Sequence, residues 1–380
     1  MELKKPVEEA LRARSRELVA SKGKGVKIIG YYPDEYLPEE LVIAAGAIPL
    51  GLARGGEYFA VSRAGAYASR WMDTFCRAQI GYLVGQEEIY YTLTDLYISP
   101  MIDCNMRIVG DCINFFTKLE EFRFGVPREK SPEALEYYLG GLNFLKDKLE
   151  SFTGNKITPE KLKESIDMCN EERELLKQIS TTRKAALPPI SGKEFIGLLH
   201  ASYVLDKKKM LELLHSFEGL KDRKGLPKGP RIMLTGTTLA WGDDKVIDLI
   251  EKTGSNIVIE QYCEALRDYW DNVEVGKTLE ENMQNIAKRY LLKKPAHVAM
   301  VPSKDRQDLI MKLIKDFKVD GVLWYQPMYR DEGDMESFYF EKRLKKEAGI
   351  PFMKLDTEYD PYEIGPMSTR VETFIELARK

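Results

Sequence analysis

Short apolar runs alternate with helical patterns in the first third of the chain. Residues 26–33 (VKIIGYYP) form a β-branched strand pattern that ends at a proline, and residues 47–54 (AIPLGLAR) form a second strand pattern. Between them, Pro38 at a first helical position, followed by Glu39 and Glu40, predicts the start of a helix. This order predicts a βαβ unit, which implies a parallel sheet and a right-handed crossover.

The same alternation continues to about residue 130. The segment 93–101 (LTDLYISPM) predicts a third strand, and the segment 120–130 contains a fourth. We therefore predict an N-terminal α/β domain with a doubly wound sheet at residues 1–130. Ligands of such sheets lie beyond the carboxyl ends of the strands, where we expect Cys104 and the 33–38 loop.

Residues 131–228 carry helical patterns only. Ser131 with Pro132 forms an N-cap and first-turn pair that predicts a helix start, and the same pairing recurs at 158–159. We interpret this segment as a helical connector that closes with the Gly-, Pro- and Lys-rich stretch KDRKGLPKGPR. Strand and helix patterns alternate again over 229–380, so a second parallel-sheet α/β domain is predicted there.

Composition is typical of a globular protein and limits the expected partners. The 380 residues are 44% hydrophobic and 31% charged, and the formal net charge is −3. That charge gives no reason to expect nucleic acid or an anionic membrane as a partner. No run approaches the roughly 20 apolar residues of a membrane span, and the charged start has no signal-peptide core. We therefore expect a cytoplasmic protein.

The cysteines are the main candidates for metal chemistry. Their number is five, odd in a chain without an export signal, which argues against disulfides. No CxxC pair indicates a zinc ribbon, a thioredoxin motif or a ferredoxin-type cluster, and three histidines are too few for a histidine site. Cys76 and Cys104 each stand where a polar break leads into a helical pattern. Thiolates at helix openings are good metal ligands, because the positive helix end lowers the pKa of a thiol.

The other three cysteines differ in position. Cys263 follows a strand pattern of the second domain and could face Cys76 and Cys104 across a cleft between the domains. Cys112 lies two turns into its helical pattern, and Cys169 lies in the middle of one. A free cysteine is also a small hydrophobe that packs well in cores. We assign Cys169 to packing and keep Cys263 and Cys112 as candidate ligands.

Two further segments could carry chemistry. Gly236, Thr237 and Thr238 follow a strand pattern and could form a backbone-amide anion site or a substrate loop; a tight turn without a ligand explains them equally well. Glu39 and Glu40 could act as acid or base near the cleft, although a first helical turn explains them without a function. No GxGxxG or GxxxxGKS/T motif supports nucleotide binding.

Several stretches match the motifs of one known protein family. YYPDEYLPEELVIAAGAIPLGLARGG is similar to an opening of the form Y-x-P-E-E-L-x-x-A-A-G-x-x-P. YASRWMDTFCRAQIGYLV and DLYISPMIDCNMR resemble two cysteine segments, the second with an extra residue before its cysteine. VIEQYCEALRDYW is similar to a D-D-x-C-x-x-x-R stretch, and the region from DGVLWYQPMY to MKLDTEY resembles the family's C-terminal part. The family is that of the 2-hydroxyacyl-CoA dehydratases and benzoyl-CoA reductases.

The resemblance implies a fold and a function. It implies two flavodoxin-like α/β domains with helices between them, and a [4Fe–4S] cluster in the interdomain cleft with Cys76 and Cys104 as ligands. Members work as paired homologous subunits, and a separate ATP-dependent, cluster-carrying activator protein donates a low-potential electron. The implied substrate is an acyl-CoA thioester, which loses a 2-hydroxyl group or is reduced in its aromatic ring. The resemblance therefore implies an iron–sulfur subunit of such a dehydratase or reductase.

One position departs from the family pattern. The third ligand of the family, in an F-C-D-P motif, falls at about Tyr329, where this chain has no cysteine. Either Cys263 or Cys112 completes the ligand set, or this subunit holds its cluster differently. The chain could also be a partner subunit, non-catalytic or electron-relaying, with a reduced site or none. A small-molecule-binding α/β protein with structural cysteines is the third alternative.

Overall fold

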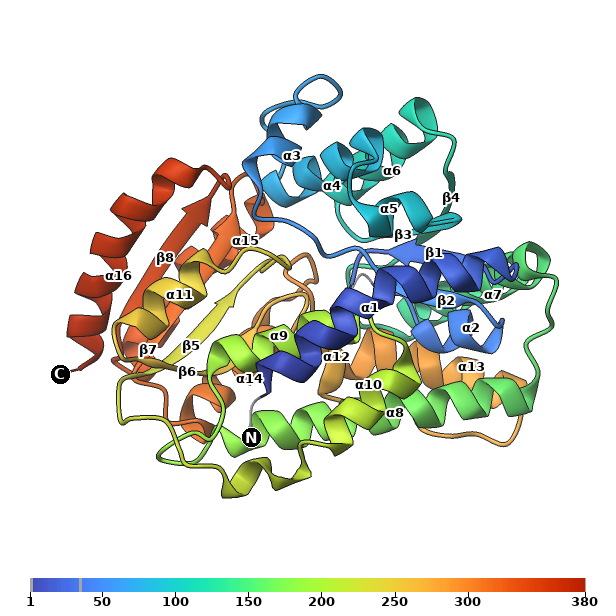
Figure 1. The fold of residues 1–380 in the computed structure, drawn as a ribbon. Coiled ribbons are helices and arrows are strands. Elements are labelled where there is room, and N and C mark those ends of the chain that lie inside the picture. The colour runs from blue at the N-terminus through green and yellow to red at the C-terminus, as the bar shows by residue number, and fades with distance from the viewer. Residues whose placement is uncertain (1–2, 34–35, 380) are drawn as a thin grey trace.

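Two parallel β-sheets organise the chain, which the computed structural model describes over residues 3–33 and 36–379 (Figure 1). The strand order of the first sheet is β2 (Ile48–Gly51), β1 (Ile28–Tyr31), β3 (Leu96–Met101) and β4 (Glu120–Gly125). The strand order of the second sheet is β6 (Asn256–Gln261), β5 (Arg231–Gly236), β7 (Gly321–Pro327) and β8 (Phe352–Thr357). Both sheets therefore have the same topology, with strand order 2-1-3-4 when the strands are counted within each sheet.

The predicted fold class, two flavodoxin-like parallel sheets with helices, is confirmed. All neighbouring strands in the two sheets pair in parallel. Strands β6 and β7 are buried at every position, as expected for strands of a parallel sheet that is covered on both faces. Parallel sheets need covering helices on both faces, and the alternating pattern supplies them.

Helices cover both sheets and join them. Those of the first part are α1 (Lys4–Gly23), α2 (Glu39–Ala44), α3 (Tyr58–Ala64), α4 (Thr74–Gly85), α5 (Ile89–Leu93) and α6 (Cys104–Phe116). The middle segment forms α7 (Pro132–Thr153), α8 (Pro159–Thr182), α9 (Gly192–Ser202) and α10 (Lys207–His215). The last part forms α11 (Lys245–Lys252), α12 (Leu266–Tyr269), α13 (Leu279–Ala287), α14 (Lys304–Asp316), α15 (Asp331–Glu347) and α16 (Ile364–Ala378). Within the described ranges, no helix is both long and apolar enough to cross a membrane.

Helix starts follow the predicted signals in most places. The side chains of Ser131 and Thr158 accept hydrogen bonds at the N-termini of α7 and α8, each followed by its proline. Pro38, by contrast, is the N-cap of α2 and not its first helical residue. The predicted 33–38 loop lies partly outside the described residues, because positions 34 and 35 are not among them.

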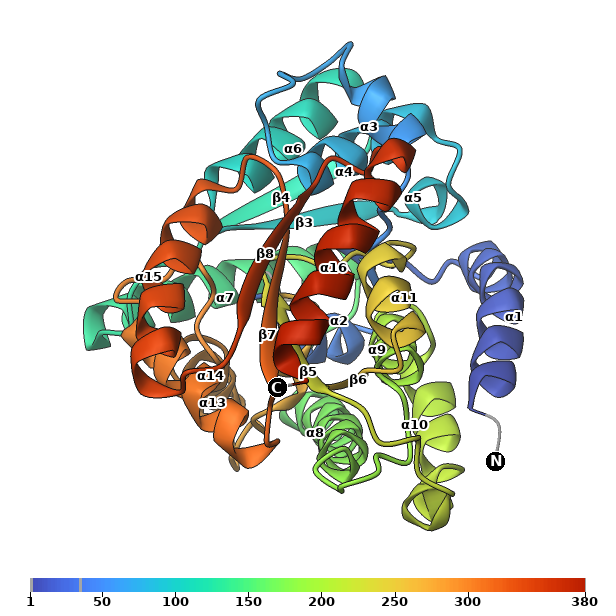
Figure 2. The same ribbon diagram turned by 90° about the vertical axis from the view of Figure 1, so that its left-hand side faces the viewer.

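The second sheet is covered on two sides by different helix pairs (Figure 2). Helices α14 and α15 lie on one face, and α11 and α16 pack together on the other. The loop from β7 into α15 thus leaves the sheet at its carboxyl edge, where the first part of the chain approaches it. This loop supplies one of the residues of the candidate site.

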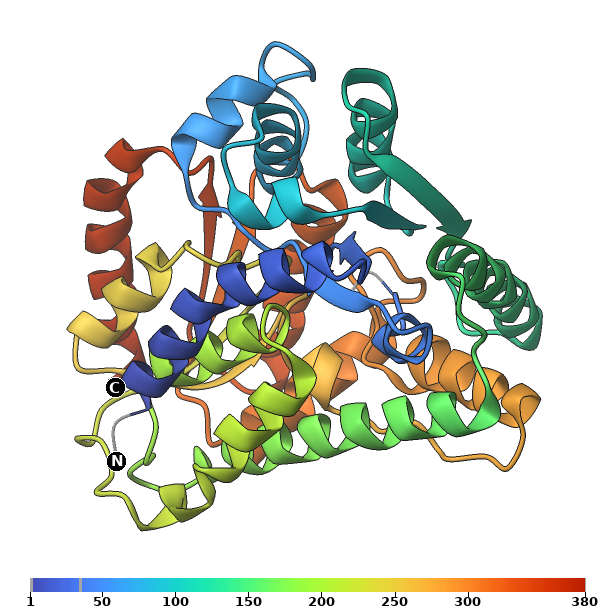
Figure 3. The ribbon, with the colours of Figure 1, turned by 45° about the vertical axis from the view of Figure 1, so that its right-hand side comes forward.

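Segments far apart in the sequence pack into the same hydrophobic cores. Helix α8 extends along both halves (Figure 3), and its start contributes Leu162 to the core of the first sheet while its end contributes Leu176 to that of the second. Met283 and Tyr290, which come from the C-terminal part of the chain, also pack into the core beside the first sheet. The two halves are therefore built on interleaved cores.

A short backbone bridge also joins the halves. Arg54 and Trp241 pair as an isolated parallel bridge. The Trp241 N–H donates to the Ala53 carbonyl at 2.8 Å, and the Trp241 carbonyl accepts from the Gly55 N–H at 3.0 Å. Gly56 has a φ of +81°, and a Cβ there would lie 2.8 Å from the carbonyl oxygen of Gly242. A glycine is needed at this position because both the dihedral angle and the close approach exclude a side chain.

Candidate functional site

Two helix openings with the same local structure face each other. Asp73 is the N-cap of α4, and its Oδ1 accepts a hydrogen bond from the Cys76 N–H at 2.8 Å. Asp103 is the N-cap of α6, and its Oδ1 accepts one from the Met106 N–H at 2.9 Å. Carboxylates are favoured at such positions because they satisfy free amides and face the positive helix end.

Equal spacing from the caps brings two sulfur atoms together. Cys76 and Met106 each stand three residues after an aspartate cap, and the Cys76 Sγ lies 3.5 Å from the Met106 Sδ. Asn105 extends the contact, since its Oδ1 accepts a hydrogen bond from the Asp73 N–H at 3.1 Å. These contacts join the N-termini of α4 and α6 to each other without any residue from the second half of the chain.

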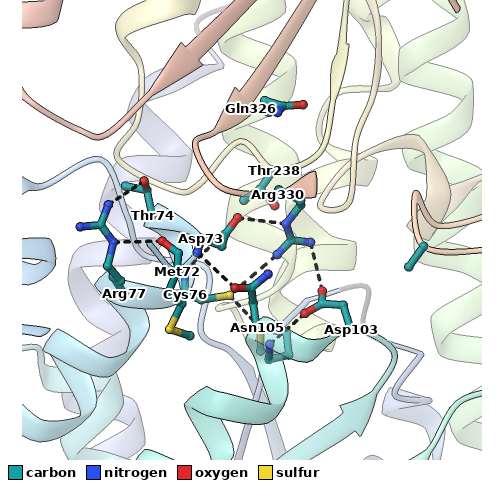
Figure 4. Close-up of polar contacts among 12 residues, drawn as sticks. Met72, Asp73, Thr74, Cys76, Arg77, Asp103, Asn105, Thr238, Gln326 and Arg330 are labelled. Atoms are coloured by element: carbon teal, nitrogen blue, oxygen red, sulfur yellow. Dashed lines mark hydrogen bonds and ion pairs between the residues drawn. The ribbon is translucent and has the colours of Figure 1, made fainter. Parts of the chain in front are cut away.

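Arg330, from the loop between β7 and α15, inserts between these openings (Figure 4). Its Nε lies 3.0 Å from the Asp73 Oδ2, and its Nη1 lies 3.2 Å from the Asp103 Oδ2. Its Nη2 lies 3.8 Å from the Cys76 Sγ. The Arg330 side chain is only 1% exposed, so these ion pairs are shielded from water.

The charges around Arg330 set its protonation. Burial by itself would lower the pKa of Arg330, but Asp73 and Asp103 outweigh burial and raise that pKa well above its usual value. The sulfur groups of Cys76 and Cys263 act on Arg330 in the same direction. Arg330 is therefore a permanent cation held by two carboxylates, with the Cys76 sulfur 3.8 Å from its Nη2.

The structure places the predicted cysteines in different surroundings. Cys76 and Cys263 are both buried within the electrostatic reach of Arg330, and the Cys263 Sγ lies 4.0 Å from the Arg267 Nη1. Cys104 is the first residue of α6 and is exposed. Burial and the neighbouring Asp103 carboxylate raise the pKa of the Cys104 thiol, so the expected lowering at a helix opening is outweighed.

Two cysteines lie inside helices. Cys112 is buried in the third turn of α6, and burial with the adjacent Asp111 raises its pKa. Cys169 is buried within α8, as its assignment to packing expects, and burial raises its pKa well above the usual value. Both thiols are therefore neutral at pH 7 in these surroundings.

The residues present do not fit an iron–sulfur cluster as they are arranged. Within the described part of the chain, no group of three or more His, Cys, Asp or Glu side chains could hold a metal ion. The guanidinium of Arg330 lies between the Asp73 and Asp103 carboxylates and beside the Cys76 sulfur, which are the atoms that would have to bind a cluster. The [4Fe–4S] cluster on this chain stays a prediction that this arrangement does not favour.

Tyr329 stands at the position of the family's third ligand and makes an aromatic contact with Trp71 instead. Its φ is +67°, and its ring makes an edge-on contact with Trp71 at 5.5 Å between centroids. The Arg77 guanidinium lies 5.9 Å from the Tyr329 ring centroid. Trp71 is 67% exposed, so this aromatic pair lies at the surface beside the buried Arg330.

Glu39 and Glu40 are bound in buried ion pairs. The Glu39 Oε2 lies 2.5 Å from the Lys207 Nζ, and its Oε1 accepts a hydrogen bond from the Tyr31 hydroxyl. The Glu40 Oε1 lies 2.6 Å from the Arg173 Nη2, and its other oxygen accepts from the Tyr290 hydroxyl at 2.9 Å. These contacts tie α2 to the helices beneath it, and none of them involves the groups around Arg330.

The Gly236–Thr238 turn lies close to the site, but its backbone is engaged. The Thr237 N–H donates to the Tyr325 carbonyl at 3.3 Å, and the Thr237 carbonyl accepts from the Cys263 N–H at 2.9 Å. The Thr238 hydroxyl lies 3.1 Å from the Tyr32 hydroxyl, which also donates to Glu264. A Cβ on Gly236 would lie 1.8 Å from the Tyr325 oxygen, so close packing against β7 explains this glycine.

Sequence reasoning missed three residues of the site: Asp73, Asp103 and Arg330. The two aspartates carry a signal that could have been used, because each stands three residues before a sulfur-containing residue at a helix opening. Arg330 stands next to the departing Tyr329, but nothing in its spacing predicts burial.

Comparisons with known proteins agree over nearly the full length. A family model described as 2-hydroxyglutaryl-CoA dehydratase, D-component, matches residues 35–377. The chain is 25% identical to the (R)-phenyllactyl-CoA dehydratase beta subunit of Clostridium sporogenes over 93% of this chain and 92% of that protein. It is 23% identical to one of the benzoyl-CoA reductase subunits of Thauera aromatica, over 92% and 90% of the two chains. It is 21% identical to the (R)-2-hydroxyglutaryl-CoA dehydratase beta subunit of Acidaminococcus fermentans, over 94% of each.

Proposed function

The chain belongs to the 2-hydroxyglutaryl-CoA dehydratase D-component family, and on that basis we propose that it is one subunit of a cytoplasmic dehydratase or reductase complex that acts on an acyl-CoA thioester. Three relatives support the substrate class, since each is named for a reaction of a CoA thioester. They also support a multi-subunit assembly, because each is named as one subunit of its enzyme.

The partner that we propose is a homologous second subunit that holds the cluster of the complex. One observation carries this assignment: the Arg330 guanidinium lies between the Asp73 and Asp103 carboxylates and beside the Cys76 thiol. A buried cation with its own carboxylate partners leaves little space for an iron–sulfur group on this chain. In this proposal, an ATP-dependent activator protein donates the low-potential electron to the cluster of the partner subunit.

This chain contributes a rigid interdomain surface to the complex. The carboxyl ends of both sheets meet at the candidate site, which is where ligands of such sheets bind. Tight anchoring by interleaved cores and by the Arg330 ion pairs would hold this surface in one shape. A fixed surface of this kind excludes water from a neighbouring reaction site and orients a substrate held there.

A second candidate function is that this chain itself carries the cluster. The observation that favours it is the placement of Cys76 and Cys263 within reach of the same cation, together with Cys104 at the opening of α6. Under this candidate, Arg330 would have to leave its carboxylates when the cluster is loaded. Iron bound to the separated chain would distinguish the two candidates.

Anaerobic purification of the tagged chain from its native cells tests the main proposal. We expect a second chain of the same family to co-purify in equal amount, and the pair to consume a 2-hydroxyacyl-CoA or aromatic acyl-CoA when ATP, activator and reductant are present. Iron and sulfide should remain with the second chain after the two are separated. Two results together would contradict the proposal: this chain purifies without a partner, and the dehydratase or reductase activity of the cells is complete without this chain.

A further inference from the structure

Each nitrogen of the Arg330 guanidinium faces a different side chain of a type that binds metals. The Nε and Nη1 atoms lie 3.0 Å and 3.2 Å from the carboxylates of Asp73 and Asp103, and the Nη2 lies 3.8 Å from the thiol of Cys76. Carboxylate oxygens and cysteine sulfur are ordinary ligands of transition metals. All four side chains are buried, so the two carboxylates require a cation within the protein.

We propose that Arg330 is a built-in cation that takes the place of a metal centre at this site and closes it to iron. The proposal rests on the proposed function in one respect, since it treats this chain as the cluster-free member of the pair. The planar guanidinium suits the role, because its N–H donors reach the Asp73 carboxylate and the Cys76 sulfur while its charge also pairs with Asp103. An incoming ion would have to displace a cation that is covalently part of the chain.

The arrangement also explains how the halves are joined without a cofactor. Asp73, Asp103 and Cys76 come from the openings of α4 and α6, whereas Arg330 comes from the loop after β7. A cluster bridging the same elements would make the joint depend on iron and on the absence of oxygen. An arginine makes the joint permanent, so the isolated chain is expected to be colourless, stable in air and free of an EPR signal.

Metal uptake by the wild-type chain is the first test. The purified full chain is incubated anaerobically with Fe²⁺, sulfide and thiol reductant, desalted, and analysed for iron, sulfide and the EPR signal after reduction. We expect no stoichiometric iron, and no change of Tm with EDTA. Stoichiometric iron and sulfide with a cluster EPR signal would overturn the proposal. If the proposed function is wrong, the co-purification experiment will show no partner or no activity, and the iron-uptake result on the isolated chain will not be affected.

Chemical rescue is the second test. Arg330→Ala leaves two buried carboxylates without their cation, and we expect its Tm to fall by about 4–6 °C. Ethylguanidinium at millimolar concentration should restore about half of that loss or more, because it refills the vacated position. Ethylammonium at equal ionic strength should restore much less, because it lacks the planar fork. Equal effects of the two ions would overturn the role assigned to the guanidinium.

Two further variants keep the test decisive. Arg343→Ala removes a partly exposed arginine on α15 whose partners, Asp308 and Glu347, are open to water, and its Tm should show no specific response to ethylguanidinium. Arg330→Lys retains a positive charge without the fork, so it should fold, stay free of iron and melt between the wild type and Arg330→Ala. If Arg330→Ala does not fold, Arg330→Lys carries the test: iron uptake by this variant or a Tm equal to that of wild type would contradict the proposal.

Discussion

At the scale of single residues, Asp73 combines two contacts that are usually made by different side chains. Its Oδ1 caps α4 through the Cys76 N–H, and its Oδ2 pairs with the Arg330 Nε. The cap fixes the start of the helix, whereas the ion pair joins that helix to the second half of the chain. A substitution can separate these roles, because asparagine retains the cap and loses the charge.

Asp73→Asn should reduce the free energy of unfolding by about 1.5–3 kcal/mol, the range for a hydrogen bond to a charged group. Arg330 keeps its second partner, Asp103, so the loss should remain below that of removing the arginine. Chemical denaturation checks the value. The matched control is Asp167→Asn, which breaks an exposed pair with Lys163 and should cost less than about 1 kcal/mol. Equal losses for both variants would show that the Arg330 pair contributes little.

His200 should make the chain sensitive to acid. Burial lowers the pKa of His200 to about 4, against the opposing effect of its hydrogen bond to the Leu239 carbonyl. The unfolded chain binds a proton near pH 6.5 and the folded chain does not until about pH 4, so this contribution to stability is present above pH 6.5 and is lost as pH falls. Relative to His200→Gln, the wild type should lose about 1.4 kcal/mol per pH unit between these values.

Denaturation of the two proteins at pH 7, 6, 5 and 4.5 measures this difference. His215→Gln is the control, because Glu171 and Glu218 raise the pKa of that exposed histidine and its effect should have the opposite sign. A difference between wild type and His200→Gln that does not change with pH would contradict the assignment.

The same scale shows what the sequence could predict at the candidate site. The cap pattern places Cys76 and Cys104 at helix openings, and the structure has both within the first turn of α4 and α6. Arg330 could not be predicted, because its ion pairs join residues more than 220 positions apart and depend on how two sheets meet. The spacing of residues along the chain predicts which side chains lie at a helix N-terminus. Which cation contacts them depends on tertiary packing.

At the scale of elements, the close packing of α3 and α4 depends on a glycine. A Cβ on Gly81 would lie 2.0 Å from the Ala60 carbonyl oxygen, so α4 touches α3 through bare backbone. Gly140, on α7, has no atom within 4 Å of a Cβ position. The two glycines therefore offer a matched pair, since both lie inside helices and differ in their surroundings.

Gly81→Ala should destabilise the fold by about 1–3 kcal/mol or more, because the helices must separate to accept the methyl group. Gly140→Ala should stabilise it by about 0.5–1 kcal/mol, the ordinary helix-propensity gain of alanine over glycine. Thermal and denaturant unfolding of both variants check the signs. A stabilising Gly81→Ala would show that α3 and α4 can part without cost.

Element boundaries mark where pattern reasoning loses accuracy. The capped helices α7 and α8 follow from their cap residues and are confirmed, whereas β1 and β3 begin at Ile28 and Leu96, two and three residues after the starts of the predicted runs at 26 and 93. The short helices α3 and α5 were not predicted, because their segments have no strong cap signal and are too brief for a periodic pattern. The last part of the predicted helical segment forms two helices, α9 and α10, which a turn near Asp206 separates.

At the scale of the whole molecule, the interleaved cores should make unfolding a single event. Met283, Ile286 and Tyr290 fill the core beside the first sheet although they follow the second sheet's first strands in the chain. A fragment comprising residues 1–130 lacks these side chains and also α8, and should therefore not fold by itself. Circular dichroism and NMR of the fragment check this, with the full chain as reference.

The calorimetric trace of the full chain should then show one transition. Two well-separated transitions, or dispersed NMR signals from the 1–130 fragment, would show that each sheet holds its own complete core. The predicted boundaries near residues 130 and 228 stay predictions about sequence organisation, since α8 contributes to the cores of both sheets.

The backbone bridge between the halves has a practical consequence for optical work. Trp241 lies in that bridge, and the Arg54 guanidinium sits 5.2 Å from its ring centroid, whereas Trp324 is fully enclosed in the second sheet and Trp71 is largely in solvent. A guanidinium over an indole face perturbs the emission of the ring, and separation of the halves would end that perturbation. A variant that retains tryptophan only at position 241 would thus carry an intrinsic fluorescent reporter of the contact between the two halves, without an attached dye.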